Sequence, residues 1–136
     1  MNPHPQHPRL QALLQAAGLR PTRQRLALAG ALFDGCPRHV TAEQVHAAMR
    51  VKRSKVSLAT VYNALHRFTE AGLLREVVID SNRIYFDTNI DMHHHFFDQA
   101  TGLLHDIPAK AVHISRLPNL PRGRQLDRVD VIIRLR

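Results

Sequence analysis

The chain has 136 residues, one cysteine and a formal net charge of +8. All of the excess positive charge lies in residues 1–75, where 11 Lys and Arg face three acids. A localised basic half is typical of a nucleic-acid binder, although a well-solvated surface also explains it. The single cysteine excludes an internal disulfide, and no signal peptide or apolar run of bilayer length is found. We therefore expect a cytoplasmic protein with no membrane partner.

Four helices are expected in the first seventy residues, because capping residues precede apolar positions spaced by three and four. A Pro- and His-rich arm containing His4 and His7 comes first and is expected to be disordered. Thr41 with Gln44 forms a capping box, and Ser57 is a good N-cap. The helices are expected from Leu10 to Ala17, from Pro21 to the break at Gly35, from Thr41 to Arg50, and from Ser57 to Glu70.

Two strands follow, at residues 73–80 and 82–87, around a short polar turn. Helices followed by a two-stranded wing predict a winged helix-turn-helix, in which the last helix enters the major groove with its N-terminal residues. Capping alone for Ser57, and packing alone for Tyr62, are the alternatives. The expected DNA contacts are Arg20, Arg23, Lys55, Ser57, Thr60, Tyr62 and Asn63.

The remaining residues, 89–136, predict a small α/β dimerisation domain after a DNA-binding domain at 1–88, and the fold class is α+β. Apolar pairs at 96–97 and 103–104 predict a hairpin, and Pro108 is expected to open a short helix. Residues 126–135 are expected to form a buried strand. So small a unit leaves an open sheet edge, which a twofold mate would cover. We expect a homodimer on palindromic, AT-rich double-stranded DNA.

Three consecutive histidines, His93, His94 and His95, stand at the start of this second domain. In a strand, His93 and His95 point to one face, with Cα atoms about 7 Å apart, and His94 points to the other. His93 and His95 can therefore bind one metal ion, while His94 is directed to a different site.

Several segments resemble the ferric uptake regulator (Fur) family of dimeric, metal-responsive bacterial transcription regulators. They are GLRPTRQR at 18–25, HVTAE at 39–43, SLATVYN at 57–63 and the histidine run, and the likeness covers nearly the whole chain. Residues 85–89 and 131–136 resemble in particular the iron response regulator (Irr) branch, whose members respond to haem.

The resemblance implies a regulatory divalent metal, Fe, Mn or Zn, between the two domains. Its ligands would be His39, Asp87, His93, His95 and Asp106. The cysteines that hold a structural zinc in many family members are replaced here by Asp98 and Thr101, so no structural zinc held by four cysteines is expected. A second metal site would use His94 and His113, but its usual later histidine has no counterpart.

Haem is the other ligand that the resemblance implies, with a haem-delivering protein as a further partner. Cys36-Pro37 resembles the short Cys-Pro motif of haem-regulated proteins, in which a thiolate binds iron. A buried cysteine that only packs is the alternative for Cys36, and His94 is the other candidate haem ligand.

The expected function is that of an iron- and haem-responsive repressor of iron and haem homeostasis genes. A haem or metal carrier, or a metal-dependent enzyme built on the His/carboxylate cluster, is the alternative. We predict no enzyme, because no general base stands beside a pocket and the basic half would have no role.

Overall fold

The computed structural model describes residues 7–136, which form two compact units that meet between Ile90 and Asp91. The sequence placed this boundary after residue 88. Of the expected disordered arm, His4 lies outside the described residues, whereas His7 already begins the first helix. Mixed helices and strands confirm the α+β class.

The first unit opens with four helices, α1 (His7–Ala16), α2 (Arg23–Leu32), α3 (Ala42–Val51) and α4 (Leu58–Glu70). The backbone N–H of the third residue of α2, α3 and α4 donates to the side chain of Thr22, Thr41 and Ser57, respectively. The capping box of Thr41 and Gln44 is complete, which confirms that prediction. Each of these three helices therefore begins where a side-chain oxygen satisfies a free backbone donor.

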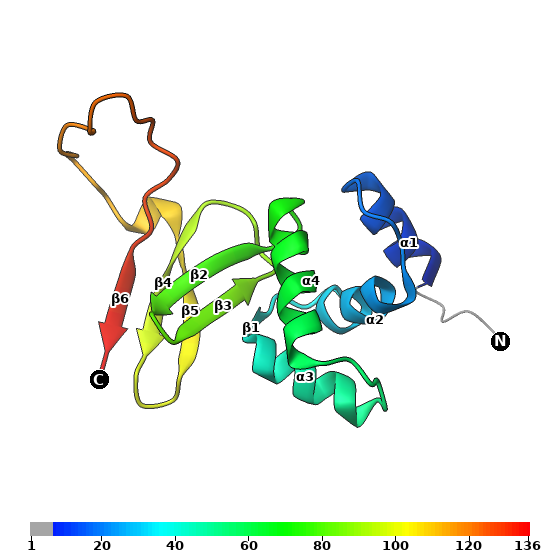
Figure 1. Cartoon of the computed structure of the whole chain (residues 1–136). Coiled ribbons are helices and arrows are strands. Elements are labelled where there is room, and N and C mark those ends of the chain that lie inside the picture. The colour runs from blue at the N-terminus through cyan, green and yellow to red at the C-terminus, as the bar shows by residue number, and fades with distance from the viewer. Residues whose placement is uncertain (1–6) are drawn as a thin grey trace. The chain divides into compact units, whose positions relative to one another are not determined.

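A single apolar core joins these helices. Figure 1 shows α2, α3 and α4 gathered on one side of the small sheet of the same unit. Leu14, Leu32, Leu65 and Phe68 are at most 1% exposed, and Phe33 stacks on Phe68 with ring centroids 6.1 Å apart. Most basic residues of this unit are left on its surface, whereas Arg75 is buried.

The sheet of the first unit contains three strands in the order β1–β3–β2, namely β1 (His39–Val40), β3 (Arg83–Asp87) and β2 (Arg75–Asp80). β2 and β3 are the predicted wing. β1 was not predicted, and it pairs antiparallel with β3 so that His39 lies opposite Asp87. Two hydrogen bonds extend this pairing, from the Arg38 N–H to the Thr88 hydroxyl and from the Thr88 N–H to the Arg38 carbonyl, at 2.9 and 3.1 Å.

The second unit is a sheet with the order β5–β4–β6, made of β4 (His93–Asp98), β5 (Leu103–Pro108) and β6 (Ile132–Leu135). The β4–β5 hairpin confirms the predicted one. Asp98 Oδ1 accepts hydrogen bonds from the backbone of Ala100 and Thr101, at 2.9 and 3.4 Å, and so closes the turn. Backbone hydrogen bonds therefore hold the positions where family members are expected to carry zinc-binding cysteines.

Two predictions for the second unit hold only in part. The helix expected after Pro108 is only a 3₁₀ turn, η1 (Ala109–Ala111), because Val112 is already extended. The expected buried strand over 126–135 shrinks to β6, which is exposed along most of its length. β6 is an edge strand, parallel to β4, and residues 112–131 form a long loop before it (Figure 1).

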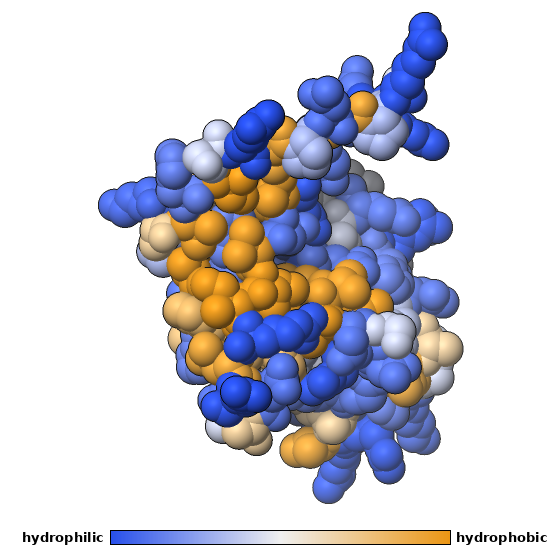
Figure 2. Space-filling model, turned by 90° about the vertical axis from the view of Figure 1, so that its left-hand side faces the viewer, coloured by the Kyte–Doolittle hydropathy of each residue, from blue (hydrophilic) through white to orange (hydrophobic). Residues whose placement is uncertain are grey.

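Apolar side chains remain on the surface of the second unit. Figure 2 looks onto the side that carries β6 and shows a broad apolar area there. Exposed apolar residues of this unit are Met92, Leu103, Ile114, Leu117, Leu120, Leu126, Ile133 and Leu135. Among the described residues, no helix combines the length and the hydropathy needed to span a bilayer.

The buried position of Phe68 allows a test of the core. Phe68→Ala should lower the free energy of unfolding by about 3–5 kcal/mol, because it removes a ring that the core encloses on all sides. Urea denaturation followed by circular dichroism measures the change. Val51→Ala is the control, since Val51 is 84% exposed and its truncation should cost at most about 0.5 kcal/mol. Similar losses for the two variants would contradict the assigned core.

Candidate metal centre and nucleic-acid interface

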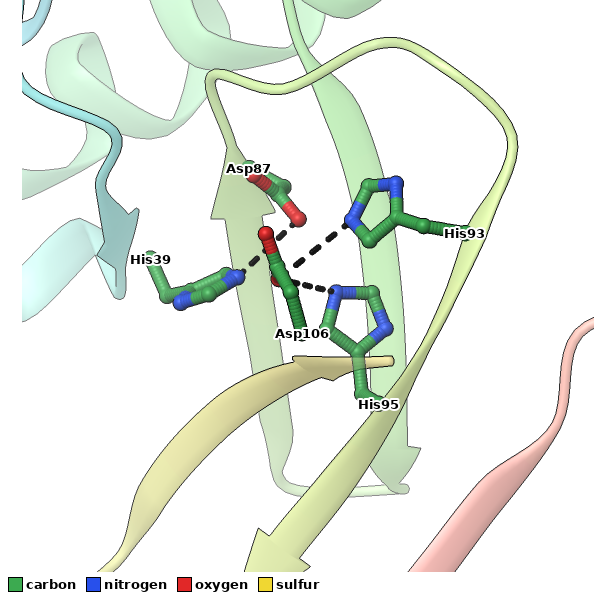
Figure 3. Close-up of side chains that lie close together, drawn as sticks. All are labelled: His39, Asp87, His93, His95 and Asp106. Atoms are coloured by element: carbon green, nitrogen blue, oxygen red, sulfur yellow. Dashed lines mark ion pairs between the residues drawn. The ribbon is translucent and has the colours of Figure 1, made fainter. Parts of the chain in front are cut away.

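The first unit brings two of the expected metal ligands, a histidine and a carboxylate, together at the end of its sheet. His39 Nε2 lies 3.1 Å from Asp87 Oδ2 (Figure 3). The other carboxylate oxygen of Asp87 accepts a hydrogen bond of 2.9 Å from the backbone N–H of Asn89, and the side chain is buried. The pair follows directly from the β1–β3 register, which sets these two residues opposite each other.

The second unit holds a set of three. His93 and His95 point to the same face of β4, and each Nε2 lies 3.5 Å from Oδ1 of Asp106 on β5 (Figure 3). His95 pairs directly with Asp106 in the β4–β5 register, and the two imidazole centroids are 4.5 Å apart. The alternation expected for the histidine run therefore holds, and it delivers two imidazoles to one carboxylate.

A backbone contact sets the chemical form of His93. Its Nδ1 lies 2.5 Å from the carbonyl oxygen of Asp91. A carbonyl only accepts hydrogen bonds, so Nδ1 carries the proton and Nε2 of the neutral ring has a lone pair. That lone pair faces the Asp106 carboxylate, which also has only lone pairs to offer. Such a contact is favourable only when a cation, a proton or a metal ion, lies between the two groups.

The donor chemistry fits a divalent transition metal. Imidazole nitrogen and carboxylate oxygen together suit zinc, iron(II) and manganese(II). The ligand atoms of His93, His95 and Asp106 lie within 4.8 Å of one another, which is the spread of atoms around one ion. A pair in one unit and a set of three in the other are each smaller than the four to six ligands that these ions take.

His94 lies on the opposite face and is already engaged. Its Nδ1 accepts a hydrogen bond of 3.1 Å from the backbone N–H of Val131, and the residue is 3% exposed. A ring that accepts at Nδ1 carries its proton at Nε2, so neither nitrogen offers a free lone pair. The geometry thus favours a structural role for His94, while His113 is exposed in the loop after η1.

Five of the seven expected DNA-contacting residues lie at the start of α4, and the other two lie at the start of α2. Ser57 caps the helix, which confirms the predicted N-cap, and its hydroxyl lies 2.9 Å from that of Thr60. Lys55 and Asn63 are exposed, and Tyr62 is half-buried. Arg20 and Arg23 are exposed at the start of α2.

The turn between α3 and α4 carries Lys52, Arg53 and Lys55. Arg53 has a φ of 61°, a left-handed conformation that costs a residue other than glycine roughly 1–2 kcal/mol. Glycine would adopt it without that cost, so the cost supports a use for the charged side chain.

Cys36 lies beside a cavity of about 370 Å³ in the first unit. The cysteine is exposed, which makes the buried-cysteine alternative wrong. Its backbone N–H donates to Asp34, and the pKa of that carboxyl is lowered, chiefly by its hydrogen bond to Arg38. The cavity is lined by Arg9, Leu32, Phe33, Gly35, Cys36, Pro37, Thr88 and Asn89.

Sequence reasoning missed the contacts that orient the ligands. The Asp91 carbonyl and the Asn89 amide are backbone groups, and no side-chain pattern signals them. The strand β1 was missed too, although its residue His39 was among the expected ligands.

The chain is similar to known proteins over most of its length. The model of the ferric uptake regulator family matches residues 16–127. A peroxide-responsive repressor of Staphylococcus epidermidis is 33% identical over 95 residues, covering 70% of this chain and 63% of that protein. Ferric uptake regulation protein 1 of Mycolicibacterium fortuitum is 35% identical over 96 residues, covering 70% and 58%. The chain thus spans less than two thirds of the length of these relatives.

A solved structure shares the fold. The ferric uptake regulator of Pseudomonas aeruginosa, solved with manganese, superposes with a TM-score of 0.65. The superposition covers 93% of this chain and 96% of that protein, and the two sequences are 24% identical. These relatives and this solved protein are regulators and a repressor, not enzymes.

Replacing His93 and His95 together by Ala should abolish stoichiometric Mn²⁺ binding, because it removes both imidazoles from the set of three. Equilibrium dialysis with elemental analysis measures the bound metal. His105→Ala is the matched control, since His105 is exposed on β5 and pairs with Phe96 rather than with a ligand. Unchanged stoichiometry in the double variant would refute the ligand assignment.

Proposed function

Because this chain belongs to the ferric uptake regulator family, we propose that it is a cytoplasmic, metal-responsive transcription regulator that binds specific DNA as a homodimer. The observation that carries the proposal is the pair of incomplete ligand sets. His39 and Asp87 belong to the first unit, and His93, His95 and Asp106 belong to the second.

We propose that one divalent ion takes ligands from both sets. Five residues separate Asp87 from His93, so the linker limits their Cα separation to about 20 Å in any arrangement of the units. The two sets together offer five ligands, a number that zinc, iron(II) or manganese(II) accepts. When bound, the ion supplies the positive charge that the facing lone pairs and carboxylates require.

Sharing one ion would couple the two units. Ligands on separate units bind the same ion only in a limited range of relative orientations, so binding selects among those orientations. Regulation requires that the selected range includes the one in which two recognition helices fit neighbouring major grooves. The ligand sets would then act on DNA affinity without touching DNA.

The DNA-binding role rests on charge and on exposed groups at the start of α4. The excess charge of the chain lies in residues 1–75, and a basic turn precedes α4. Lys55, Arg20 and Arg23 would contact phosphates, while Thr60, Tyr62 and Asn63 would approach base edges. Ser57 would hold the helix start at the groove.

The homodimer is supported by exposed apolar residues on one face of the second sheet. Leu103, Ile133 and Leu135 lie on the face of the sheet opposite His93 and His95, and each is at least 39% exposed. β5 and β6 are the edges of this sheet. A twofold mate would cover apolar surface of this kind and set two α4 helices on a palindromic, AT-rich site.

Within the family we propose the iron response regulator branch, and therefore a repressor of iron and haem homeostasis genes that responds to haem. Of the candidate haem ligands, Cys36 is favoured over His94, because its sulfur is accessible beside a cavity whereas both nitrogens of His94 are accounted for. A haem-delivering protein would be the partner at this exposed thiol. The second metal site with His94 and His113 is not favoured.

An enzyme on the same cluster is less well supported. The ligand set contains carboxylates and imidazoles that face one another, and the described cavity lies beside Cys36 rather than at these ligands. A metal carrier without DNA binding would leave the basic turn unexplained.

The DNA-binding proposal is tested with the duplex that the Mn²⁺-loaded protein selects from a random-sequence pool. Fluorescence anisotropy in the presence of Mn²⁺ and of a chelator should show tighter specific binding with the metal. Tyr62→Ala should reduce discrimination between selected and random duplexes by about 1–3 kcal/mol.

Lys55→Ala is the matched control at the same interface. It should weaken binding to all duplexes alike and lower the slope of log affinity against log salt by about one, because it removes one phosphate contact. The absence of specific DNA binding in every metal state would refute the proposal. Equal loss of discrimination in both variants would contradict the division of roles.

The haem proposal predicts that Cys36→Ala removes the thiolate-ligated absorption band from a haem titration of the full chain. His94→Ala should keep that band, although it should lower stability by leaving the Val131 N–H without its acceptor. A band unchanged in Cys36→Ala would exclude this cysteine as the ligand.

A further inference from the structure

A hydrogen bond joins α3 to α4 at the expected DNA interface. The hydroxyl of Tyr62 on α4 donates to Oε1 of Glu43 on α3, at 2.9 Å. Glu43 is in the first turn of its helix, and Tyr62 is in the second turn of α4. The contact therefore links the supporting helix to a side chain that would meet the bases.

A second contact restricts the same ring. His66, one turn further along α4, stacks on Tyr62 with centroids 6.3 Å apart and an interplanar angle of 21°. Tyr62 is also packed against the apolar core at its inner edge. The ring is thus held from the side and at its tip, which fixes its direction while leaving part of it exposed. The pKa of the Tyr62 hydroxyl is raised, chiefly by the hydrogen bond to Glu43.

The charge of Glu43 is unusual for its position. It is one of three acids among residues 1–75, and the other two are paired with arginines, Asp34 with Arg38 and Glu70 with Arg67. Glu43 instead contacts a neutral phenol, so it places a negative charge where a polyanion would bind. An acid in the first turn favours the helix through its dipole, but that effect does not require a contact with Tyr62.

We propose that Glu43 is a positioning residue for sequence recognition, which orients Tyr62 so that it reads DNA with its ring and not as a hydroxyl donor. The hydroxyl has one proton to donate, and that hydrogen bond goes to Glu43. What Tyr62 then offers is the exposed part of an aromatic ring, which suits the apolar C5-methyl group of thymine. This inference rests on the proposed DNA-binding function of α4.

Uracil substitution in the selected duplex provides the test, because it removes only the thymine methyl groups. For the Mn²⁺-loaded protein, replacement at the contacted thymine should lower affinity about fourfold, the effect of one buried methyl group. Tyr62→Ala, which should lose this preference, identifies the contacted position. Glu43→Ala should reduce the preference at that position to less than about twofold.

Two further variants separate positioning from charge and from helix stability. Glu43→Gln keeps an oxygen that accepts the phenolic proton, so it should retain the thymine preference. Glu70→Ala removes the same charge from the same unit without touching Tyr62, and it should retain the preference as well. Thermal unfolding of each variant shows whether α3 is intact.

A titration without DNA tests the contact itself. The phenolate absorbance that Tyr62→Phe removes should appear at lower pH in Glu43→Ala than in the unmodified protein, because the proton acceptor is gone.

The possible outcomes separate the inference from the function on which it rests. Thymine preference lost in Glu43→Ala and kept in Glu43→Gln supports the positioning role. Specific binding with the same thymine preference in Glu43→Ala overturns it and leaves the DNA-binding function standing. No specific binding by the unmodified protein overturns both.

Discussion

The pairing of β1 with β3 is the constraint on which the ligand pair of the first unit depends. The two residues of β1 bring His39 next to Asp87, although 48 positions separate them in the sequence. The hydrogen bonds between Arg38 and Thr88 extend this pairing by one residue beyond the strands. One side of this junction carries the ligand pair, and the other side borders the cavity beside Cys36. A change in either place acts on the same short stretch of backbone. This shared backbone would give the proposed metal and thiol sites a physical route to each other.

Local chemistry made much of the fold predictable. Thr41 and Ser57 begin their helices in the sequence as they do in the structure, because a cap needs only neighbours within one turn. β1 escaped notice since two residues show no periodicity and its partner is far along the chain. The strand at the C-terminus was judged buried from its apolar residues, yet burial of an edge strand depends on what lies beside it, which periodicity does not encode.

The candidate site was predictable to a similar extent and for similar reasons. Alternation in the histidine run required only the geometry of a strand, and the structure has it. The identities of His39, Asp87 and Asp106 came from the family resemblance rather than from spacing. What neither could supply is the chemical form of each imidazole, because a carbonyl at Asp91 and an amide at Val131 decide it. Those groups are the same in every sequence, and only the fold shows where they lie.

The unequal roles of His93, His94 and His95 have a consequence for how such a run can change over time. Residues of one type stand at three neighbouring positions, yet two point Nε2 at a carboxylate and one accepts a backbone hydrogen bond. Inserting or deleting one residue within β4 would exchange the two faces beyond that point. What constrains the run is therefore the strand face to which each histidine points, rather than the number of its histidines. Insertions or deletions of two residues preserve the arrangement, whereas a change of one residue would move a proposed ligand to the opposite face.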